Sequence, residues 1–172
     1  MTAIPATLAQ LFARLDGLTI AHRTVDHGPV FTVEEAKTHR GAIAGGHTKN
    51  FFLKDNKGRP FLAVTLEDCA VDLKALGPAI GAGRLSFASP ELLRAHLGVE
   101  PGSVTPFALI NDRDAKVVPV LDQAMLDHDV LNFHPLVNTA TTAIASADLI
   151  RFVRACGHAP LILRFPQAVR AV

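Results

Sequence analysis

The stretch that decides the fold is Gly-Gly-His-Thr-Lys-Asn-Phe-Phe-Leu-Lys-Asp, residues 45–55. Two glycines give the backbone conformational freedom ahead of Lys49 and Asn50, and the apolar run 51–53 follows directly. Closed by the turn-forming residues 55–58, this run predicts a β-strand with polar groups at its entrance. Lysine is strongly hydrated and seldom buried, so Lys49 is either a functional cation or a solvated residue at a strand end. The spacing alone leaves both interpretations open.

A second apolar run, residues 61–66, follows the turn, and together the two runs predict an antiparallel hairpin. The runs 107–110 and 117–121 predict a second hairpin, in which Pro119 places its strand at an edge or a bulge. Mixed helices and strands without strict alternation predict an α+β fold with a largely antiparallel or mixed sheet. Helices are expected from Pro5 to Gly17, Thr32 to Gly41, Asp72 to an interruption at Gly77-Pro78, Ser89 to Gly98 and Ser146 to Gly157, and further strands at 20–25, 85–87, 138–144 and 161–163.

The composition is that of one globular domain, which we expect to span residues 1–172. The chain is 49% hydrophobic, and its 17 basic and 16 acidic residues leave a net charge of +1. That balance excludes the broad positive surface of proteins that bind long duplexes, so any nucleic-acid contact should be local. Cys69 and Cys156 are too few for a disulfide framework. The chain shows no signal peptide and no apolar stretch that could span a bilayer, so we expect a cytoplasmic protein with no membrane partner.

The loop 98–106 is the second candidate for chemistry. Pro101 and Pro106 stiffen it, and Gly102 allows backbone amides to approach a ligand closely. A rigid loop with accessible amides suits an anionic or carbonyl oxygen. The alternative is an ordinary connection between a helix and a strand.

The loop 132–138 is the third candidate. Pro135 restricts the backbone directly after His134, and Asn138 can donate and accept hydrogen bonds nearby. A lone histidine can equally be a structural residue that is held by hydrogen bonds, so the sequence leaves its role open.

Other enzyme signatures are missing from the sequence. It contains no His-Glu-x-x-His pair, no Gly-x-Ser-x-Gly elbow, no phosphate-binding loop and no Gly-x-Gly-x-x-Gly fingerprint. Its eight histidines are scattered without the spacing of metal ligands. We therefore expect a site without a metal or an organic cofactor.

Five segments, in this order, resemble the YbaK/ProX aminoacyl-tRNA editing family. They are HGPVFTVEEA at 27–36, KNFFLKD at 49–55, LSFAS at 85–89, GVEPGSVTPF at 98–107 and NFHPL at 132–136. Within the family the chain is most similar to freestanding ProX-type deacylases, relatives of the editing domain inserted in bacterial prolyl-tRNA synthetase. The resemblance implies a compact α+β domain with a mixed, strongly curved sheet flanked by helices.

The resemblance also implies an activity. Such proteins hydrolyse the ester that joins a wrong amino acid to the terminal adenosine of tRNA, and the substrate implied here is alanine on proline tRNA. A cysteinyl-tRNA(Pro) deacylase and a non-catalytic module that binds aminoacyl-tRNA or a synthetase are the alternatives. The implied partner is tRNA, with prolyl-tRNA synthetase or an elongation factor as candidate protein partners.

The family pattern assigns roles to residues of the three loops. Lys49 is the functional lysine, and residues 102–106 form a Gly-x-x-x-Pro loop at the pocket. His134 lies against the bound aminoacyl group. No protein base is evident, so the terminal ribose hydroxyl is expected to orient or activate the attacking water. The substrate-binding residues expected are Asn50, Gly102, Ser103, Val104, Thr105, Pro106, His134 and Asn138.

Overall fold

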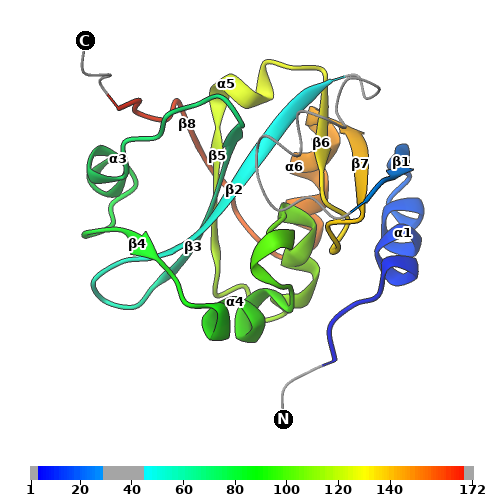
Figure 1. The fold of residues 1–172 in the computed structure, drawn as a ribbon, viewed down its shortest axis with the longest axis horizontal. Coiled ribbons are helices and arrows are strands. Elements are labelled where there is room, and N and C mark those ends of the chain that lie inside the picture. Colours follow the sequence, from blue (N-terminus) through cyan, green and yellow to red (C-terminus); the bar gives the residue numbers. More distant parts are fainter. Residues whose placement is uncertain (1–3, 29–44, 169–172) are drawn as a thin grey trace.

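The computed structural model describes residues 4–28 and 45–168 and confirms the predicted α+β class (Figure 1). One mixed sheet runs in the order β1-β7-β6-β2-β3-β5-β8, and β4 pairs with β2 beside this path. The predicted helix at 32–41 lies outside the described residues. The strands are β1 (His22–Asp26), β2 (Gly46–Lys54), β3 (Pro60–Leu66), β4 (Ser86–Phe87), β5 (Val118–Asp122), β6 (Val130–Phe133), β7 (Ala140–Ala145) and β8 (Leu161–Leu163), and the helices are α1 (Leu8–Gly17), α3 (Leu73–Ala79), α4 (Pro90–Leu97), α5 (Gln123–Leu126), α6 (Ser146–Ala155) and the 3-10 helices η1 (Pro101–Ser103) and η2 (Pro106–Asn111).

Strand β2 crosses the middle of the molecule and forms the predicted antiparallel hairpin with β3 (Figure 1). Asp55 fixes the turn, because its carboxylate accepts hydrogen bonds from the amides of Lys57 (3.0 Å) and Arg59 (2.9 Å). The strand begins at Gly46, so Lys49 lies within it and not at its entrance. The first residues of β2 are strand because they pair with β6, a segment far away in the sequence.

The second hairpin is not formed. Residues 107–110 belong to the 3-10 helix η2, and β5 pairs in parallel with β3 on one side and β8 on the other. Pro119 therefore lies in an interior strand, contrary to the prediction. It is tolerated because β8 begins opposite Val120, so β5 has a single neighbour at Pro119 itself.

The helix ends follow the local sequence in most cases. Thr7 accepts a hydrogen bond from the amide of Gln10 and forms a capping box at α1, and Ser89 caps α4. The interruption predicted at Gly77-Pro78 is absent, because α3 continues to Ala79. Pro78 lies in the final turn of α3, where a proline removes a single backbone hydrogen bond. Gly77 is required for a different reason, since a Cβ at this position would lie 2.5 Å from the Gly83 carbonyl oxygen. Ser146 begins α6 without capping it.

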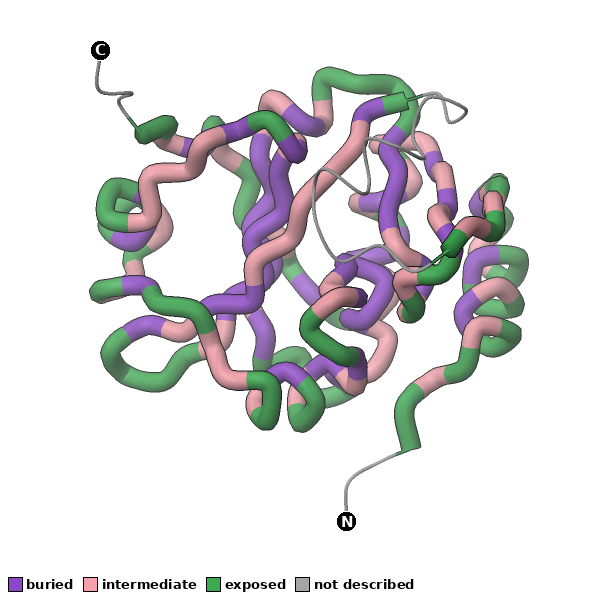
Figure 2. The backbone as a smooth tube through the Cα atoms, viewed as in Figure 1, coloured by how far each residue is buried: buried purple, intermediate pink, exposed green. Residues whose placement is uncertain are grey.

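Two apolar cores lie on the two faces of the central strands. Figure 2 shows that these strands are among the most buried parts of the backbone. Successive side chains of a strand point to opposite faces, so Leu62 enters the larger core while Phe61 and Ala63 enter the smaller one. Helices α1, α4, α6 and η2 cover the larger core, and α3 contributes Leu76 to the smaller one. Strand β3 is consequently buried on both faces.

Phe107 anchors the strand that leads to the third candidate loop. Its ring makes T-shaped contacts with Phe133 of β6, at 5.8 Å between centroids, and with Phe152 of α6, at 5.4 Å. Each such pair contributes about 0.5–1.5 kcal/mol beyond the area it buries. The contacts hold the end of β6 firmly, and His134 is the next residue.

Candidate active site

A small polar cavity lies where β2 and β6 separate. The two strands pair only through Gly46 opposite Leu131 and His47 opposite Asn132. Beyond these pairs they diverge, and a cavity of about 60 Å³ opens between them. The described residues that line it are His47, Thr48, Asn50, Glu67, Asn132, Phe133, His134 and Thr141.

Hydrogen bonds hold the two strands together at the base of this cavity. The Thr48 hydroxyl donates to the carbonyl oxygen of Asn132 at 2.7 Å, and the Asn132 amide nitrogen donates to the Gly46 carbonyl oxygen at 3.2 Å. At Asn50, the Oδ1 atom is buried and accepts no hydrogen bond from any described residue. A buried acceptor without a partner costs about 1–3 kcal/mol, so Asn50 presents a carbonyl oxygen that a bound donor could satisfy.

His134 is held in one orientation at the end of β6. Its Nδ1 atom lies 3.3 Å from the Ala140 carbonyl oxygen, which can only accept, so Nδ1 carries the proton and Nε2 is left as an acceptor. The chain turns sharply behind it, with Leu136 in the left-handed region at φ 70°. Burial lowers the pKa of His134, and the nearby His27 acts in the same direction. The imidazole is therefore neutral at pH 7.

A second histidine, His27, contacts a residue of the cavity lining. His27 follows β1, and its Nε2 atom lies 2.8 Å from the Thr141 hydroxyl, while its Nδ1 atom lies 2.7 Å from the Gly28 carbonyl oxygen. The carbonyl again fixes the proton on Nδ1, so Thr141 donates to Nε2. This pair orients the hydroxyl of a residue that lines the cavity.

Lys49 lies beside the cavity and not in its lining. Its half-buried side chain shares a face of β2 with His47 and Phe51, and its ammonium lies 5.5 Å from the centre of the Phe51 ring. Within the described parts of the chain Lys49 forms no ion pair. The ammonium is therefore available to an anionic ligand.

The predicted Gly-x-x-x-Pro loop leads into Phe107, whose ring packs on Phe133 of β6. Gly102 and Ser103 lie in η1, and Thr105, which is fully buried, accepts a hydrogen bond from the Phe107 amide at 3.3 Å. None of the residues 102–106 lines the cavity, and Asn138, in the turn between β6 and β7, does not line it either. Of the predicted residues the structure thus brings Asn50 and His134 together, with Lys49 adjacent.

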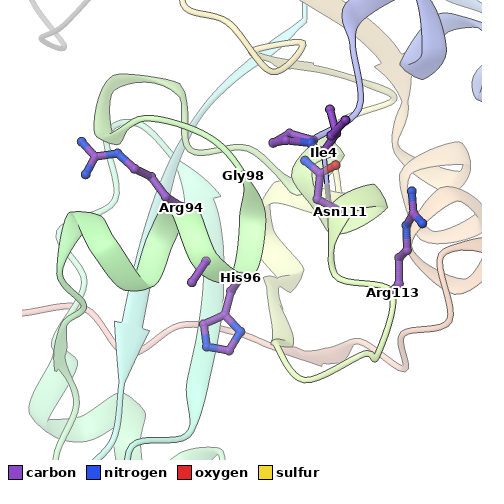
Figure 3. A pocket seen from close by; sticks show the side chains of 8 residues that line it. Ile4, Arg94, His96, Gly98, Asn111 and Arg113 are labelled. Carbon is purple, nitrogen blue, oxygen red and sulfur yellow. The ribbon is translucent and has the colours of Figure 1, made fainter. Parts of the chain in front are cut away.

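Two larger hollows lie along the N-terminal segment. One, of about 320 Å³, lies among Ile4, Arg94, His96 and neighbouring residues (Figure 3), and the other, of about 1030 Å³, lies between α1, η2 and the end of α6. Arg94 is engaged by Glu100 through its Nε and Nη2 atoms at 2.8–3.0 Å. Neither hollow contains a predicted site residue, so the small cavity at the strand junction is the better candidate.

Three observations bear on other chemistries. Within residues 4–28 and 45–168 no three His, Cys, Asp or Glu side chains are grouped to hold a metal ion. Both cysteines are free, and burial raises the pKa of the Cys156 thiol to about 11, which leaves it protonated. No helix in the described residues is long and apolar enough to cross a membrane.

Comparison with known proteins places this geometry in a family. The family model described as the aminoacyl-tRNA editing domain matches residues 27–152, a span that contains the whole cavity. The chain belongs to this family. It is 41% identical over 162 residues to the mouse (Mus musculus) prolyl-tRNA synthetase associated domain-containing protein 1, covering 91% of this chain and 95% of that protein. It is 37% identical to the prolyl-tRNA editing protein ProX of Acetoanaerobium sticklandii, covering 86% and 91%.

Solved structures support the fold. A crystal structure described as a candidate trans-editing enzyme for prolyl-tRNA synthetase superposes with a TM-score of 0.73 at 19% identity, covering 95% of this chain and 99% of that one. The crystal structure of hypothetical protein APE2540 gives the same TM-score at 17% identity, covering 90% and 97%. Both predictions, the editing family and its curved mixed sheet, are confirmed.

The sequence did not single out all the residues at the cavity of this editing domain. His47 and Asn132 lay inside quoted motifs without a role, and Thr141 was part of an expected strand. His27 begins the first motif of the resemblance, and that is the signal by which it could have been found. Thr141 carries no such signal, because only the pairing of β1, β6 and β7 brings it to the cavity.

Proposed function

We propose that this editing-domain protein hydrolyses misacylated proline tRNA in trans and that alanyl-tRNA(Pro) is its preferred substrate. The observation that carries the proposal is the small cavity at the junction of β2 and β6, whose lining includes two residues with acceptor atoms, Asn50 with Oδ1 and His134 with Nε2. The names of the relatives support the choice of tRNA, since they refer to prolyl-tRNA synthetase or to prolyl-tRNA editing.

The size of the cavity favours a small aminoacyl group. Its volume of about 60 Å³ is several times the roughly 10–15 Å³ that a cavity needs to hold one water. A methyl side chain fits that space better than the pyrrolidine ring of proline. A synthetase pocket shaped for proline rejects alanine by only about 1–3 kcal/mol, so a second site that admits the smaller residue supplies the missing discrimination.

The two acceptors suit the α-ammonium group of an aminoacyl ester. An ammonium offers three N–H donors and no acceptor, whereas Asn50 Oδ1 and the neutral His134 Nε2 offer lone pairs. A protonated His134 would repel the ammonium and lose its lone pair. The low pKa of His134 therefore serves recognition of the substrate.

Lys49 supplies the positive charge of the reaction. Water attacks the ester carbonyl carbon, the oxygen becomes negative in the tetrahedral intermediate, and the bond to the ribose oxygen then breaks as that oxygen takes a proton. The Lys49 ammonium stabilises the negative charge that develops, or binds the terminal phosphate and so positions the ester. Residues 102–106 lead into Phe107, whose ring packs on Phe133 and so holds the neighbouring His134 in place. The neighbouring ribose hydroxyl orients the water.

A single-turnover assay with proline tRNA carrying alanine, serine, glycine, cysteine or proline tests the proposal. We expect alanine to be released fastest and prolyl-tRNA to be spared. Preference for the cysteinyl ester would move the chain to a cysteine-editing role. Binding without any hydrolysis would make it a non-catalytic module.

A further inference from the structure

Phe87 is an exposed aromatic side chain at the edge of the sheet. The residue is 62% exposed, and among the exposed large apolar residues of the described chain it is the aromatic one. The neighbouring Arg84 and Ser86 are also exposed, so Phe87 is not part of a wide apolar patch of the kind that proteins bury against each other. A single exposed aromatic ring can instead stack against one planar group of similar size in a binding partner.

The register of the strands places Phe87 in a row with Lys49. Phe87 of β4 lies opposite Leu53 of β2, and residues 49, 51 and 53 share one face of that strand. The rings of Phe51 and Phe87 meet in a T-shape at 5.6 Å and 87°, and the Lys49 ammonium lies 5.5 Å from the Phe51 ring centre. The Lys49 ammonium, the Phe51 ring and the exposed Phe87 ring thus lie in a row on one face of the paired strands β2 and β4.

We propose that this row binds the single-stranded 3′ end of tRNA, with a nucleobase stacked on Phe87 and a backbone phosphate near Lys49. Every base has a π-face, so an exposed aromatic ring beside a cation binds single strands without reading their sequence. The T-shaped contact uses at most one side of the Phe87 ring, which leaves the other side to a base. The inference rests on the proposed function and adds to it a nucleotide subsite outside the cavity.

The distance along β2 selects the nucleotide. Lys49 and Leu53 are four residues apart, which is about 13 Å at the rise of an extended strand. The terminal adenosine carries the ester and must stay beside Asn50 and His134. The base on Phe87 is therefore that of one of the two cytidines that precede the adenosine.

The test compares four proteins, the wild type and the variants Phe87→Ala, Phe87→Leu and Phe87→Trp. Two quantities are measured: the dissociation constant of a short single-stranded RNA ending in CCA, and the single-turnover rate of deacylation over a range of enzyme concentrations. Loss of one stacked base should weaken binding about 5- to 150-fold. We expect that loss for Phe87→Ala, a partial loss for Phe87→Leu and none for Phe87→Trp, with the rate at saturation within about threefold of wild type in all variants.

Ile162→Ala is the matched control, because Ile162 is a 39% exposed apolar residue on β8, separated from β2 by β3 and β5. It should leave binding unchanged. The RNA probe is also tested with an abasic site at each cytidine, and at one of the two positions Phe87→Ala should have no further effect.

The outcomes separate this inference from the proposed function. If the wild type deacylates alanyl-tRNA but Phe87→Ala binds the probe as tightly as wild type, the stacking site is wrong and the function stands. If the wild type hydrolyses no aminoacyl-tRNA, the function is wrong, and Phe87-dependent binding of the probe alone decides the inference. A loss of binding shared by Ile162→Ala would also overturn it, since the effect would not be local.

Discussion

Replacing Asn50 by alanine should lower activity without lowering stability. Asn50 Oδ1 is buried and accepts no hydrogen bond from the described residues, so the folded protein already bears the cost of that acceptor, about 1–3 kcal/mol. Alanine removes this cost and loses some packing in a cavity of about 60 Å³. The two effects oppose each other, and we expect a free energy of unfolding equal to that of wild type or up to about 1 kcal/mol higher.

Asn111 provides the matched control. Its Oδ1 atom accepts a hydrogen bond from the Ala6 amide at 2.7 Å, and its Nδ2 atom donates to the Leu97 carbonyl oxygen at 2.8 Å. Asn111→Ala breaks both bonds and should cost about 1–3 kcal/mol. The same substitution at two sites should therefore differ by about 2 kcal/mol, or roughly 4–8 °C in melting temperature for a domain of this size.

Activity should show the opposite order. In the proposed function, Asn50→Ala removes a hydrogen bond to a charged group of the substrate. Such a bond is worth about 1.5–3 kcal/mol, so alanyl-tRNA deacylation should slow by about 10- to 150-fold. Asn111→Ala should retain near-normal activity below its melting temperature. Thermal unfolding followed by circular dichroism and the single-turnover assay measure the two quantities. If Asn50→Ala is the less stable variant and keeps full activity, the amide is a structural group and the argument fails.

Three further predictions concern charges. Lys49→Met keeps an apolar stem over Phe51 but removes the ammonium, so deacylation should fall by about 100-fold or more with an unchanged melting temperature; a folded variant of near-normal activity would exclude Lys49 from the reaction. Because burial lowers the pKa of His134, the neutral acceptor should persist below pH 6.5, and the deacylation rate should fall only at lower pH as the ring gains a proton. A midpoint above 6.5, or an identical profile for His134→Gln, would contradict this. Although burial alone would raise the pKa of Asp112, hydrogen bonds from His158 and from the Val117 amide outweigh it and hold the pKa below its usual range. Asp112→Asn should therefore cost about 1.5–3 kcal/mol at pH 7. In urea titrations this difference should begin to shrink near pH 4, where the carboxylate of the unfolded chain gains its proton, and should be lost as the pH falls through the lower pKa of the folded protein.

The sequence by itself determined the features that depend on neighbouring residues. The cap at Ser89 and the left-handed Gly98 fix both ends of α4 within ten residues. The hairpin of β2 and β3 follows from two apolar runs and the short turn at Asp55. Several motifs in a fixed order were enough to predict the family and with it the class of fold. Local backbone preferences and short-range hydrogen bonds determine the ends of α4 and the hairpin of β2 and β3. The assignment to the family rests on the motifs.

The tertiary structure decided what depends on pairing between distant segments. An apolar run such as 107–110 has no periodicity that separates a strand from a buried 3-10 helix, and here Thr105 caps the helix that Pro106 begins. Pro119 was misplaced because the sequence does not show where β8 begins to pair. The cavity itself exists because β2 pairs with β6 for two residues and then departs toward β3.

The same reasoning explains the outcome at the candidate site. Asn50 and His134 were predicted from chemistry and motifs, and the structure brings both to one cavity. The Gly-x-x-x-Pro loop has the composition of a ligand-binding loop; its residues do not line this cavity, and Phe107, which follows the loop, packs on Phe133 of β6. Residue types and short spacings in the sequence predict which side chains could take part in catalysis or binding. Which of them meet is set by strand register, because a shift of one residue turns a side chain from the cavity to the opposite face.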